Sequence, residues 1–224
     1  MPSNIRNFFE AIPVVTRNLL FINVLMFIAT LINENFMVGT FAMFYPSSWF
    51  FRWWQPLTHM FMHGGVWHIL FNMYTLVMFG MVVERVLGTR KFLILYFVTG
   101  FGAVLLHTGV EWIQVQSLLK EIDAGSAEAQ QTYFDLLRTP MLGASGAIYG
   151  VLVAFAMLYP EAKMTLLFPP VTLDAKWMVL IFIGIELVTG ITGAAVSVAH
   201  FAHLGGALFG FLLVRYWQNK QKLY

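Results

Sequence analysis

Six apolar stretches with few charged positions divide the chain. They cover residues 18–37, 67–87, 91–112, 140–159, 173–190 and 197–217. Each is long enough to cross a hydrocarbon core of about 30 Å as a helix that rises about 1.5 Å per residue. Backbone groups in lipid must bond to one another, so helices are the structure expected for segments of this length. The pattern predicts an all-α membrane protein, with six transmembrane helices in a single domain over residues 1–224.

Composition supports this prediction and excludes several other classes of protein. The 224 residues are 59% hydrophobic and 11% charged, whereas soluble domains average about 25% charged residues. The absence of cysteine excludes disulfides and thiolate metal sites, and the net charge of +2 gives no indication of nucleic-acid binding. The first apolar stretch is of spanning length with no small-residue cleavage site after it, so we do not expect a cleavable signal.

The distribution of Lys and Arg predicts the orientation. If the amino terminus is cytoplasmic, ten of the thirteen Lys and Arg residues lie on the cytoplasmic side, and only Arg52, Lys120 and Arg138 lie in external loops. The positive-inside rule therefore favours two cytoplasmic termini. The first external loop, 38–66, is rich in Trp and Phe and is expected to lie partly embedded in the outer interface. The second, 113–139, is expected to contain a short helix.

Polar residues inside the apolar segments are costly in lipid and are candidates for function. The second segment carries His68 and Asn72 four residues apart, the fourth carries Ser145, and the sixth carries His200 and His203. These three segments all run from outside to inside. Ser145 lies about five residues and His203 about six residues into its predicted helix, which places both with His68 in roughly the outer third of the membrane.

Two pairs of glycines favour close packing of the fourth and sixth segments. Gly146 and Gly150 follow Ser145, and Gly206 and Gly210 follow His203. Small residues four apart let helix backbones approach closely in lipid. We therefore expect the serine hydroxyl to come within hydrogen-bond reach of a histidine on the neighbouring helix.

This arrangement predicts nucleophilic catalysis. A serine needs a base to take its proton, and histidine is the usual base at neutral pH, which assigns Ser145 as nucleophile and His203 as base. His68, the Asn72 amide and the backbone N–H of Ser145 are suitable donors for an oxyanion. No carboxylate is identified at this depth, so a dyad is predicted rather than a triad. Tyr149, one turn below Ser145, is expected to pack against the imidazole.

Each assignment has an ordinary structural alternative. A membrane serine is usually a small residue at a packing face, His68 can bond a backbone carbonyl, and Asn72 can join two helices. His200 competes with His203 as the base. We favour His203 because of its spacing to the paired glycines, and we expect His200 to lie in a loop or at the rim of the cavity.

Four other polar positions receive structural interpretations, and a fifth has no assigned role. His59 and His63 have a spacing found in metal ligands, but we favour hydrogen bonds that fix the first external loop, and no metal or cofactor is predicted. Glu84 and Arg85 are expected to form a cytoplasmic ion pair. Glu186, in the fifth segment, is expected to face the interior or an aqueous opening, and its role is not assigned.

Four motifs occur in an order typical of one family. They are HMFMHGGVWHILFN at residues 59–72, ERVLG at 84–88, GASG at 143–146 and AHLGGALFG at 202–210. The chain resembles the rhomboid intramembrane serine proteases over nearly its whole length. The resemblance departs at Trp54-Gln55, where the family often has Trp-Arg, so an expected loop anchor is altered.

The resemblance implies a rhomboid-like bundle of six helices with a water-accessible cavity that opens outward. It implies Ser145 as nucleophile within the Gly143–Gly146 motif, His203 as base, and His68 with Asn72 in the oxyanion hole. It also implies single-pass membrane proteins as substrates and a lid formed by the loop after the fifth helix. The short amino terminus resembles the minimal form of the family, which favours a bacterial inner membrane. No oligomeric state and no natural substrate are predicted.

Two other functions fit parts of this pattern less well. A non-catalytic relative that binds client helices would lack the serine or the histidine, and both are present. A histidine-lined transporter of metal or protons would be expected to show inverted repeats or broken paired helices, and neither is found. Other intramembrane proteases are disfavoured because the chain has no His-Glu-x-x-His motif and no paired intramembrane aspartates.

Overall fold

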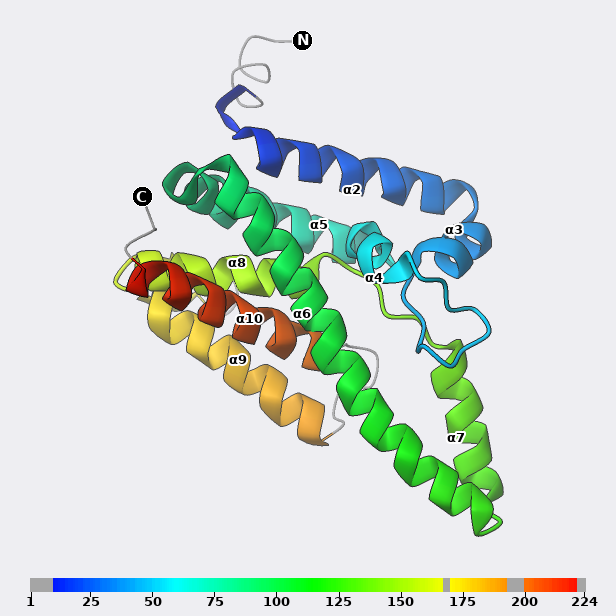
Figure 1. Ribbon diagram of the computed structural model, residues 1–224. Helices are drawn as coiled ribbons and strands as arrows, with labels where there is room; N and C mark the ends of the chain where they lie inside the picture. The colour runs from blue at the N-terminus through cyan, green and yellow to red at the C-terminus, as the bar shows by residue number, and fades with distance from the viewer. Residues whose placement is uncertain (1–9, 167–169, 193–199, 221–224) are drawn as a thin grey trace.

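The computed structural model describes residues 10–166, 170–192 and 200–220, which are mainly helical (Figure 1). The elements, in chain order, are α2 (Val14–Ile32), α3 (Glu34–Phe41), α4 (Gln55–Thr58), the short 3-10 helix η1 (His59–Phe61), α5 (Val66–Thr75), the π-helix η2 (Leu76–Gly80), α6 (Met81–Asp123), α7 (Ala127–Arg138), α8 (Ser145–Leu158), β1 (Lys163–Thr165), β2 (Thr172–Asp174), α9 (Ala175–Thr192) and α10 (His200–Asn219). Every predicted apolar segment falls mainly on helix. Residues 197–199 of the last segment, and residues 193–196 of the expected lid loop, lie outside the described residues.

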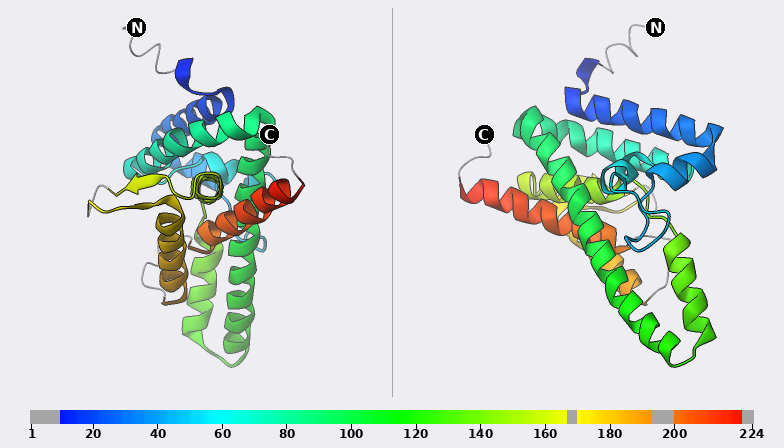
Figure 2. Two further views of the ribbon diagram at one scale, coloured as in Figure 1. Left: turned by 90° about the vertical axis from the view of Figure 1, so that its left-hand side faces the viewer. Right: turned by 45° about the vertical axis from the view of Figure 1, so that its right-hand side comes forward.

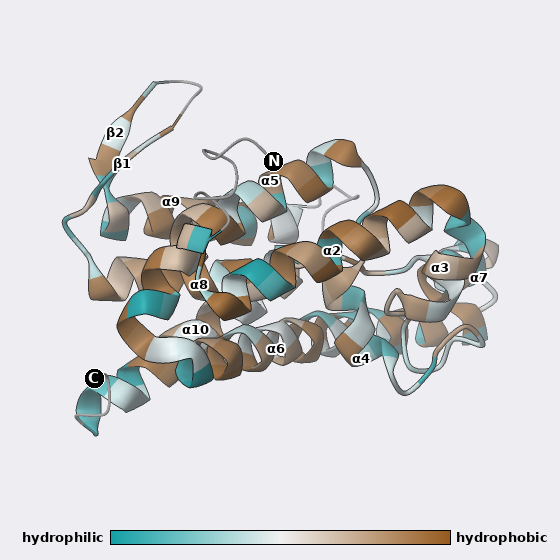
Figure 3. Ribbon diagram, turned by 90° about the horizontal axis from the view of Figure 1, so that it is seen from above, coloured by the Kyte–Doolittle hydropathy of each residue, from teal (hydrophilic) through white to brown (hydrophobic). Residues whose placement is uncertain are grey.

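Three helical stretches are long and apolar enough to cross a membrane, namely Val14–Ile32, Val66–Asp123 and Ala175–Thr192, while α8 is apolar but shorter. Figure 3 shows that hydrophobic residues dominate these helices. The 58 residues of Val66–Asp123 are far too many for one span of about 20 residues. Gly88 interrupts the stretch with a φ of 76°, a conformation that favours glycine. The chain turns there, so the stretch consists of two consecutive helices and not of one continuous helix.

Helices α6, α8 and α10 form the centre of the molecule (Figure 1). A Cβ on Gly206 would lie 1.8 Å from the carbonyl oxygen of Gly146, and one on Gly210 would lie 2.8 Å from the Cα of Gly150. These contacts leave no room for a side chain between α8 and α10. The predicted close approach through the two glycine pairs is confirmed.

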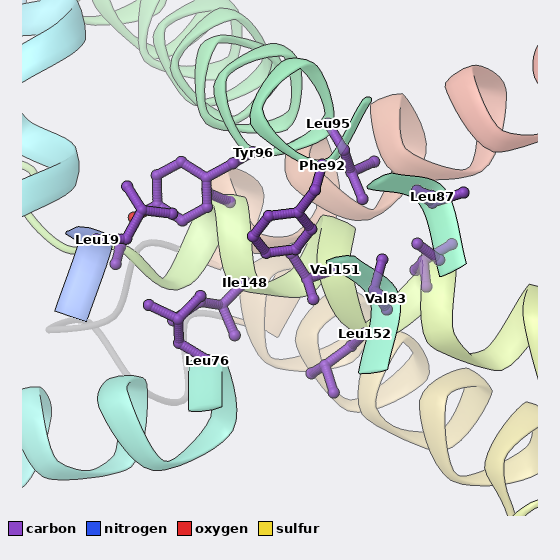
Figure 4. Close-up of a cluster of buried hydrophobic side chains, with 14 of the residues drawn as sticks. Leu19, Leu76, Val83, Leu87, Phe92, Leu95, Tyr96, Ile148, Val151 and Leu152 are labelled. Carbon is purple, nitrogen blue, oxygen red and sulfur yellow. The ribbon is translucent and has the colours of Figure 1, made fainter. Parts of the chain in front are cut away.

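A cluster of buried aliphatic and aromatic side chains fills the space between α2, η2, α6 and α8 (Figure 4). Phe92, Leu95 and Tyr96 of α6 and Leu76 of η2 have no exposed surface. Their packing holds α6 against α8. The site on α8 is therefore built on a rigid support.

Glu84 and Arg85 have different partners, so the expected pairing between them is wrong. The buried Glu84 carboxylate accepts hydrogen bonds from the backbone N–H groups of Val15 and Thr16, at 2.9 and 2.7 Å. Arg85 donates to the carbonyl oxygen of Ala11 at 2.7 Å. A carboxylate at the start of α2 satisfies amides that lack partners inside the helix. Glu84 and Arg85, the first two residues of the ERVLG motif, therefore join the start of α2 to α6.

The second loop, predicted over residues 113–139, differs in one boundary from its prediction. The short helix is confirmed as α7, but α6 continues to Asp123, well past the predicted membrane exit at residue 112. Figure 2 shows α7 returning alongside the far end of α6. The polar residues that follow Trp112 extend an existing helix because their composition favours helix in water as well.

Gln55 anchors the first loop, within residues 38–66. Its side chain is buried; the amide nitrogen donates to the carbonyl oxygen of Phe50 at 3.0 Å, and the amide oxygen accepts from the N–H of Arg52 at 3.0 Å. The indole nitrogen of Trp54 donates to the carbonyl oxygen of Thr40 at 2.9 Å. The Trp-Gln pair thus holds the loop to α3.

A two-stranded antiparallel hairpin, not predicted from the sequence, joins α8 to α9. Lys163 of β1 contacts Asp174 of β2 at 2.5 Å. This ammonium group lowers the pKa of the Asp174 carboxyl. The hairpin fixes where α9 begins beside α8.

Candidate active site

Ser145 is the first residue of α8, so its predicted place five residues into a helix is wrong. Residues 140–144 are not helical: Met141 pairs with Met43 in an isolated β-bridge, and Gly143 has a φ of 132°. The N–H of Gly143 donates to the carbonyl oxygen of His59 at 3.0 Å. Because α8 starts at the serine, the N–H groups of Ser145 and the next two residues have no acceptor inside the helix.

His203 approaches the serine from α10. Its Nε2 lies 2.7 Å from the Oγ of Ser145. The ring of Tyr149 stacks on the imidazole, with centroids 4.5 Å apart and planes 8° apart. The sequence predicted that these three side chains meet, and the structure brings them together.

The opposite edge of the imidazole contacts a carboxylate that the sequence analysis did not place here. Glu186 of α9 is buried, and its Oε1 lies 2.9 Å from Nδ1 of His203. The hydroxyl of Tyr149 donates to the same oxygen at 2.6 Å. The expectation that no carboxylate lies at this depth is wrong. In the topology predicted from the sequence, the fifth segment runs from inside to outside, which places residue 186 near the outer face.

His200 is buried and does not lie in a loop or at a rim, as had been expected. Its Nδ1 lies 2.5 Å from Oε2 of Glu186 and 3.2 Å from Oγ1 of Thr189. Both oxygens of the carboxylate therefore have histidine partners. Of the two histidines, only His203 has a described contact with Ser145, which supports the choice of His203 as the base.

His68 faces the serine from α5. A Cβ placed on Gly143 would lie 2.8 Å from Nε2 of His68 and 3.6 Å from Oγ of Ser145. The N–H of Gly64 approaches Nδ1 of His68 at 3.4 Å. A neutral imidazole that accepts at Nδ1 carries its proton on Nε2, so the nitrogen that faces Gly143 is a donor. A side chain at residue 143 would block this nitrogen.

Asn72 lies one turn further along α5, and its side chain is buried. Its Nδ2 has no hydrogen-bond partner among the residues that the structure describes. A buried donor without an acceptor costs free energy in a folded protein. The amide is thus available to bond an oxygen atom brought by a ligand, which agrees with the predicted role.

His59 and His63 lie in the last part of the first loop, 38–66, beside the site. Nδ1 of His59 contacts the carbonyl oxygen of Gln55 at 3.1 Å, which supports the loop-fixing role expected for His59. The ring of His63 packs edge-on against His68, with centroids 5.0 Å apart. Neither ring nitrogen of His63 has a hydrogen-bond partner among the described residues, so the hydrogen bonds expected for His63 are not found. Burial lowers the pKa of His59 to about 4 and that of His63 to about 3. Both rings are therefore neutral at pH 7.

A small cavity of about 10 Å³ adjoins the serine, with room for about one water molecule. Its lining residues are His59, Ala103, Met141, Leu142, Gly143, Ser145, Gly146 and Ala202. Within the described ranges, no group of three or more His, Asp or Glu side chains is arranged to hold a metal ion.

Comparison with known proteins identifies the family. The family model described as "Rhomboid domain" matches residues 50–219. The chain belongs to the rhomboid family. This match contains all four motifs and every residue of the site described above, so the resemblance stated from the sequence is confirmed.

Rhomboid proteins from several sources are similar to this one. Human "Presenilin-associated rhomboid-like protein, mitochondrial" is 30% identical over 177 residues, which cover 75% of this chain and 40% of that protein. "RHOMBOID-like protein 6, mitochondrial" of Arabidopsis thaliana is 28% identical over 71% of this chain and 42% of its own length. "Rhomboid protease AarA" of Providencia stuartii is 26% identical over 72% of this chain and 54% of its own. This rhomboid chain thus spans between two fifths and about half of the length of these relatives.

Proposed function

We propose that this rhomboid protein is an intramembrane serine protease that hydrolyses peptide bonds in or near the transmembrane segments of membrane proteins. The observation that carries the proposal is the 2.7 Å contact between Oγ of Ser145 and Nε2 of His203. A serine hydroxyl bonded to a histidine nitrogen is the arrangement that activates a serine nucleophile. The similarity to a bacterial rhomboid protease supports the same function.

The reaction follows from the positions of these groups. Oγ of Ser145 bonds to the carbonyl carbon of the substrate while its proton moves to Nε2 of His203. When the C–N bond breaks, His203 gives that proton to the leaving amine. Water then attacks the acyl group, its proton passes to His203, and the ester bond breaks as His203 returns a proton to Oγ. The products are a free amine and a carboxylic acid.

The charge that develops on the carbonyl oxygen needs donors that are already in place. The Nε2–H of His68, the amide of Asn72 and the first N–H groups of α8 supply them in this proposal. Each such donor is worth about 2.7–4 kcal/mol in transition-state stabilisation when measured by its removal. Gly143 has no side chain, which leaves space between His68 and the serine for the substrate carbonyl.

The proposed topology has six spans in one domain, two cytoplasmic termini and a site that opens outward. The positions of Lys and Arg support it. In this orientation the β1–β2 hairpin is cytoplasmic, and α4 and α7 lie on the outer side. Single-pass membrane proteins are the proposed substrates, since one extended segment can reach Ser145 from the lipid or the outer surface. A bacterial inner membrane stays a prediction, because the relatives include bacterial and mitochondrial proteins.

The test is cleavage of a reporter protein with one membrane helix, by the purified protein in liposomes. Wild type should release the outer part of the reporter, and Ser145→Ala should abolish release. Ser117→Ala is the matched control, because Ser117 is exposed on α6 and contacts Glu121; it should cleave as wild type does. Release of the outer part of the reporter by Ser145→Ala would refute the proposal. Reporter binding without cleavage by wild type would instead favour a non-catalytic relative.

A further inference from the structure

Glu186 is a buried acid from a third helix that contacts the proposed base. We propose that Glu186 is the positioning residue of a Ser-His-Glu triad, and that it acts on the serine only through His203. This inference rests on the proposed function. It follows from the contacts that the Glu186 carboxylate makes with His203, Tyr149 and His200.

The two nitrogens of His203 have separate partners. Nε2 lies 2.7 Å from the serine hydroxyl and Nδ1 lies 2.9 Å from Oε1 of Glu186. A carboxylate accepts only, so it holds the proton of a neutral imidazole on Nδ1. Nε2 then has a free lone pair and can take the proton of Ser145. After that transfer, the same carboxylate stabilises the imidazolium.

Tyr149 contacts both the imidazole of His203 and the carboxylate of Glu186 and so fixes their relative position. Its ring stacks on the face of His203, and its hydroxyl donates to Oε1 of Glu186 at 2.6 Å. Tyr149 and Ser145 are four residues apart on α8 and so lie on one face of it. The helix that carries the nucleophile therefore also fixes the acid relative to the base.

The other carboxylate oxygen is held as well. Oε2 lies 2.5 Å from Nδ1 of His200. A buried carboxylate is costly unless it is hydrogen-bonded, and three side chains from α8 and α10 meet this need. The carboxylate cannot turn away from His203 without losing several of these bonds. We infer that His200 orients the acid and does not act as a second base.

A purely structural role is the alternative. The buried residues of α9 are Ala175, Met178, Val179 and Glu186, and the first three lie in its first turns. Among the described residues of α9, Glu186 is therefore the buried residue that holds the outer half of this helix against α8 and α10. The experiment must distinguish loss of this contact between helices from loss of the orientation of His203.

The test is Glu186→Gln, which keeps the shape of the side chain and removes its charge. We expect kcat to fall by about 10²–10⁴, as for removal of the acid in other serine triads, with KM within about threefold because substrate binding is untouched. Labelling of Ser145 by a fluorophosphonate should slow in parallel. Glu186→Asp should recover part of the loss. Glu111→Gln is the matched control: Glu111 pairs with His107 at 3.4 Å on α6, and this variant should keep wild-type kcat.

A spectroscopic readout distinguishes positioning from folding. The 15N shifts of His203 in histidine-labelled protein report which ring nitrogen carries the proton. Wild type should show the Nδ1–H form, and Glu186→Gln should lose it while its thermal unfolding midpoint stays near that of wild type. An unchanged tautomer, or a kcat within threefold of wild type while Ser145→Ala is inactive, would overturn the triad and leave the protease intact. Absence of cleavage and of Ser145 labelling in wild type would instead refute the proposed function.

Discussion

Gly206 of α10 lies directly against the backbone of α8 beside the site, and the structure specifies what an added methyl group would do there. A Cβ at this position would be 1.8 Å from the carbonyl oxygen of Gly146, whereas real Cβ contacts are essentially never closer than 3.0 Å. The obstacle is backbone, so in Gly206→Ala the two helices must separate by about 1.2 Å or more. The same displacement would lengthen the 2.7 Å contact between Ser145 and His203 to about 3.9 Å, which is beyond hydrogen-bond range.

We therefore expect Gly206→Ala to lower kcat by at least about 10²-fold, the cost of misplacing catalytic groups by about 1 Å. Overpacking should also lower the free energy of unfolding by about 1–3 kcal/mol. Both quantities are measured on purified protein, by reporter cleavage and by thermal unfolding.

Gly184→Ala is the matched control. It makes the same change on α9, where a Cβ would meet nothing within 4 Å. Its kcat should equal that of wild type. Cleavage by Gly206→Ala within threefold of this control would refute the reasoning, because the helix contact would then not set the distance between Ser145 and His203.

Three further predictions test other parts of the site. His68→Ala should lower kcat by about 10²–10³ with little change in KM, since one oxyanion donor is lost; a change in KM alone would instead place His68 in substrate binding. Tyr149→Phe keeps the stacked ring but loses the bond to Glu186, and should lower kcat about tenfold, equivalent to about 1.4 kcal/mol; equal loss in Tyr149→Phe and Tyr149→Ala would mean that stacking contributes nothing. Gln55→Ala should lower stability by about 1–3 kcal/mol, because buried backbone groups of the first loop lose their partner; an unchanged unfolding midpoint would contradict its anchoring role.

The sequence predicted the positions of the membrane helices and the meeting of three site residues for clear physical reasons. Apolar length determines where helices can cross lipid. The predicted alternation of direction placed Ser145 and His203 at one depth, and the glycine pairs allow the close approach seen in the structure. Tyr149 was predicted to contact the imidazole from helical spacing alone, and it does so.

Glu186 shows what the sequence analysis overlooked. The expected direction of the fifth segment already placed residue 186 near the outer face, at the depth of the serine. Its costly position in an apolar helix was noted, but the rotation of α9 about its axis determines whether the side chain faces lipid or His203. Hydrophobic pattern does not determine that rotation, because α9 is apolar on most sides. A comparison of depth among all intramembrane polar residues would have identified the candidate.

Helix boundaries could be predicted less well than helix positions. The start of α8 at Ser145 depends on the positive φ of Gly143 and on pairing of Met141 with a loop about 100 residues earlier in the chain. The π-helical turn Leu76–Gly80 depends on packing against neighbouring helices. Such features depend on tertiary contacts, which the local sequence does not determine.

The most direct test of the central claim is to map where a fluorophosphonate probe reacts with the protein, by mass spectrometry of its peptides. One adduct, on Ser145, is expected in wild type and in His200→Ala, and it should be lost in His203→Ala. An adduct on a different serine would contradict the assignment of the nucleophile. Labelling that persists in His203→Ala and vanishes in His200→Ala would contradict the assignment of the base.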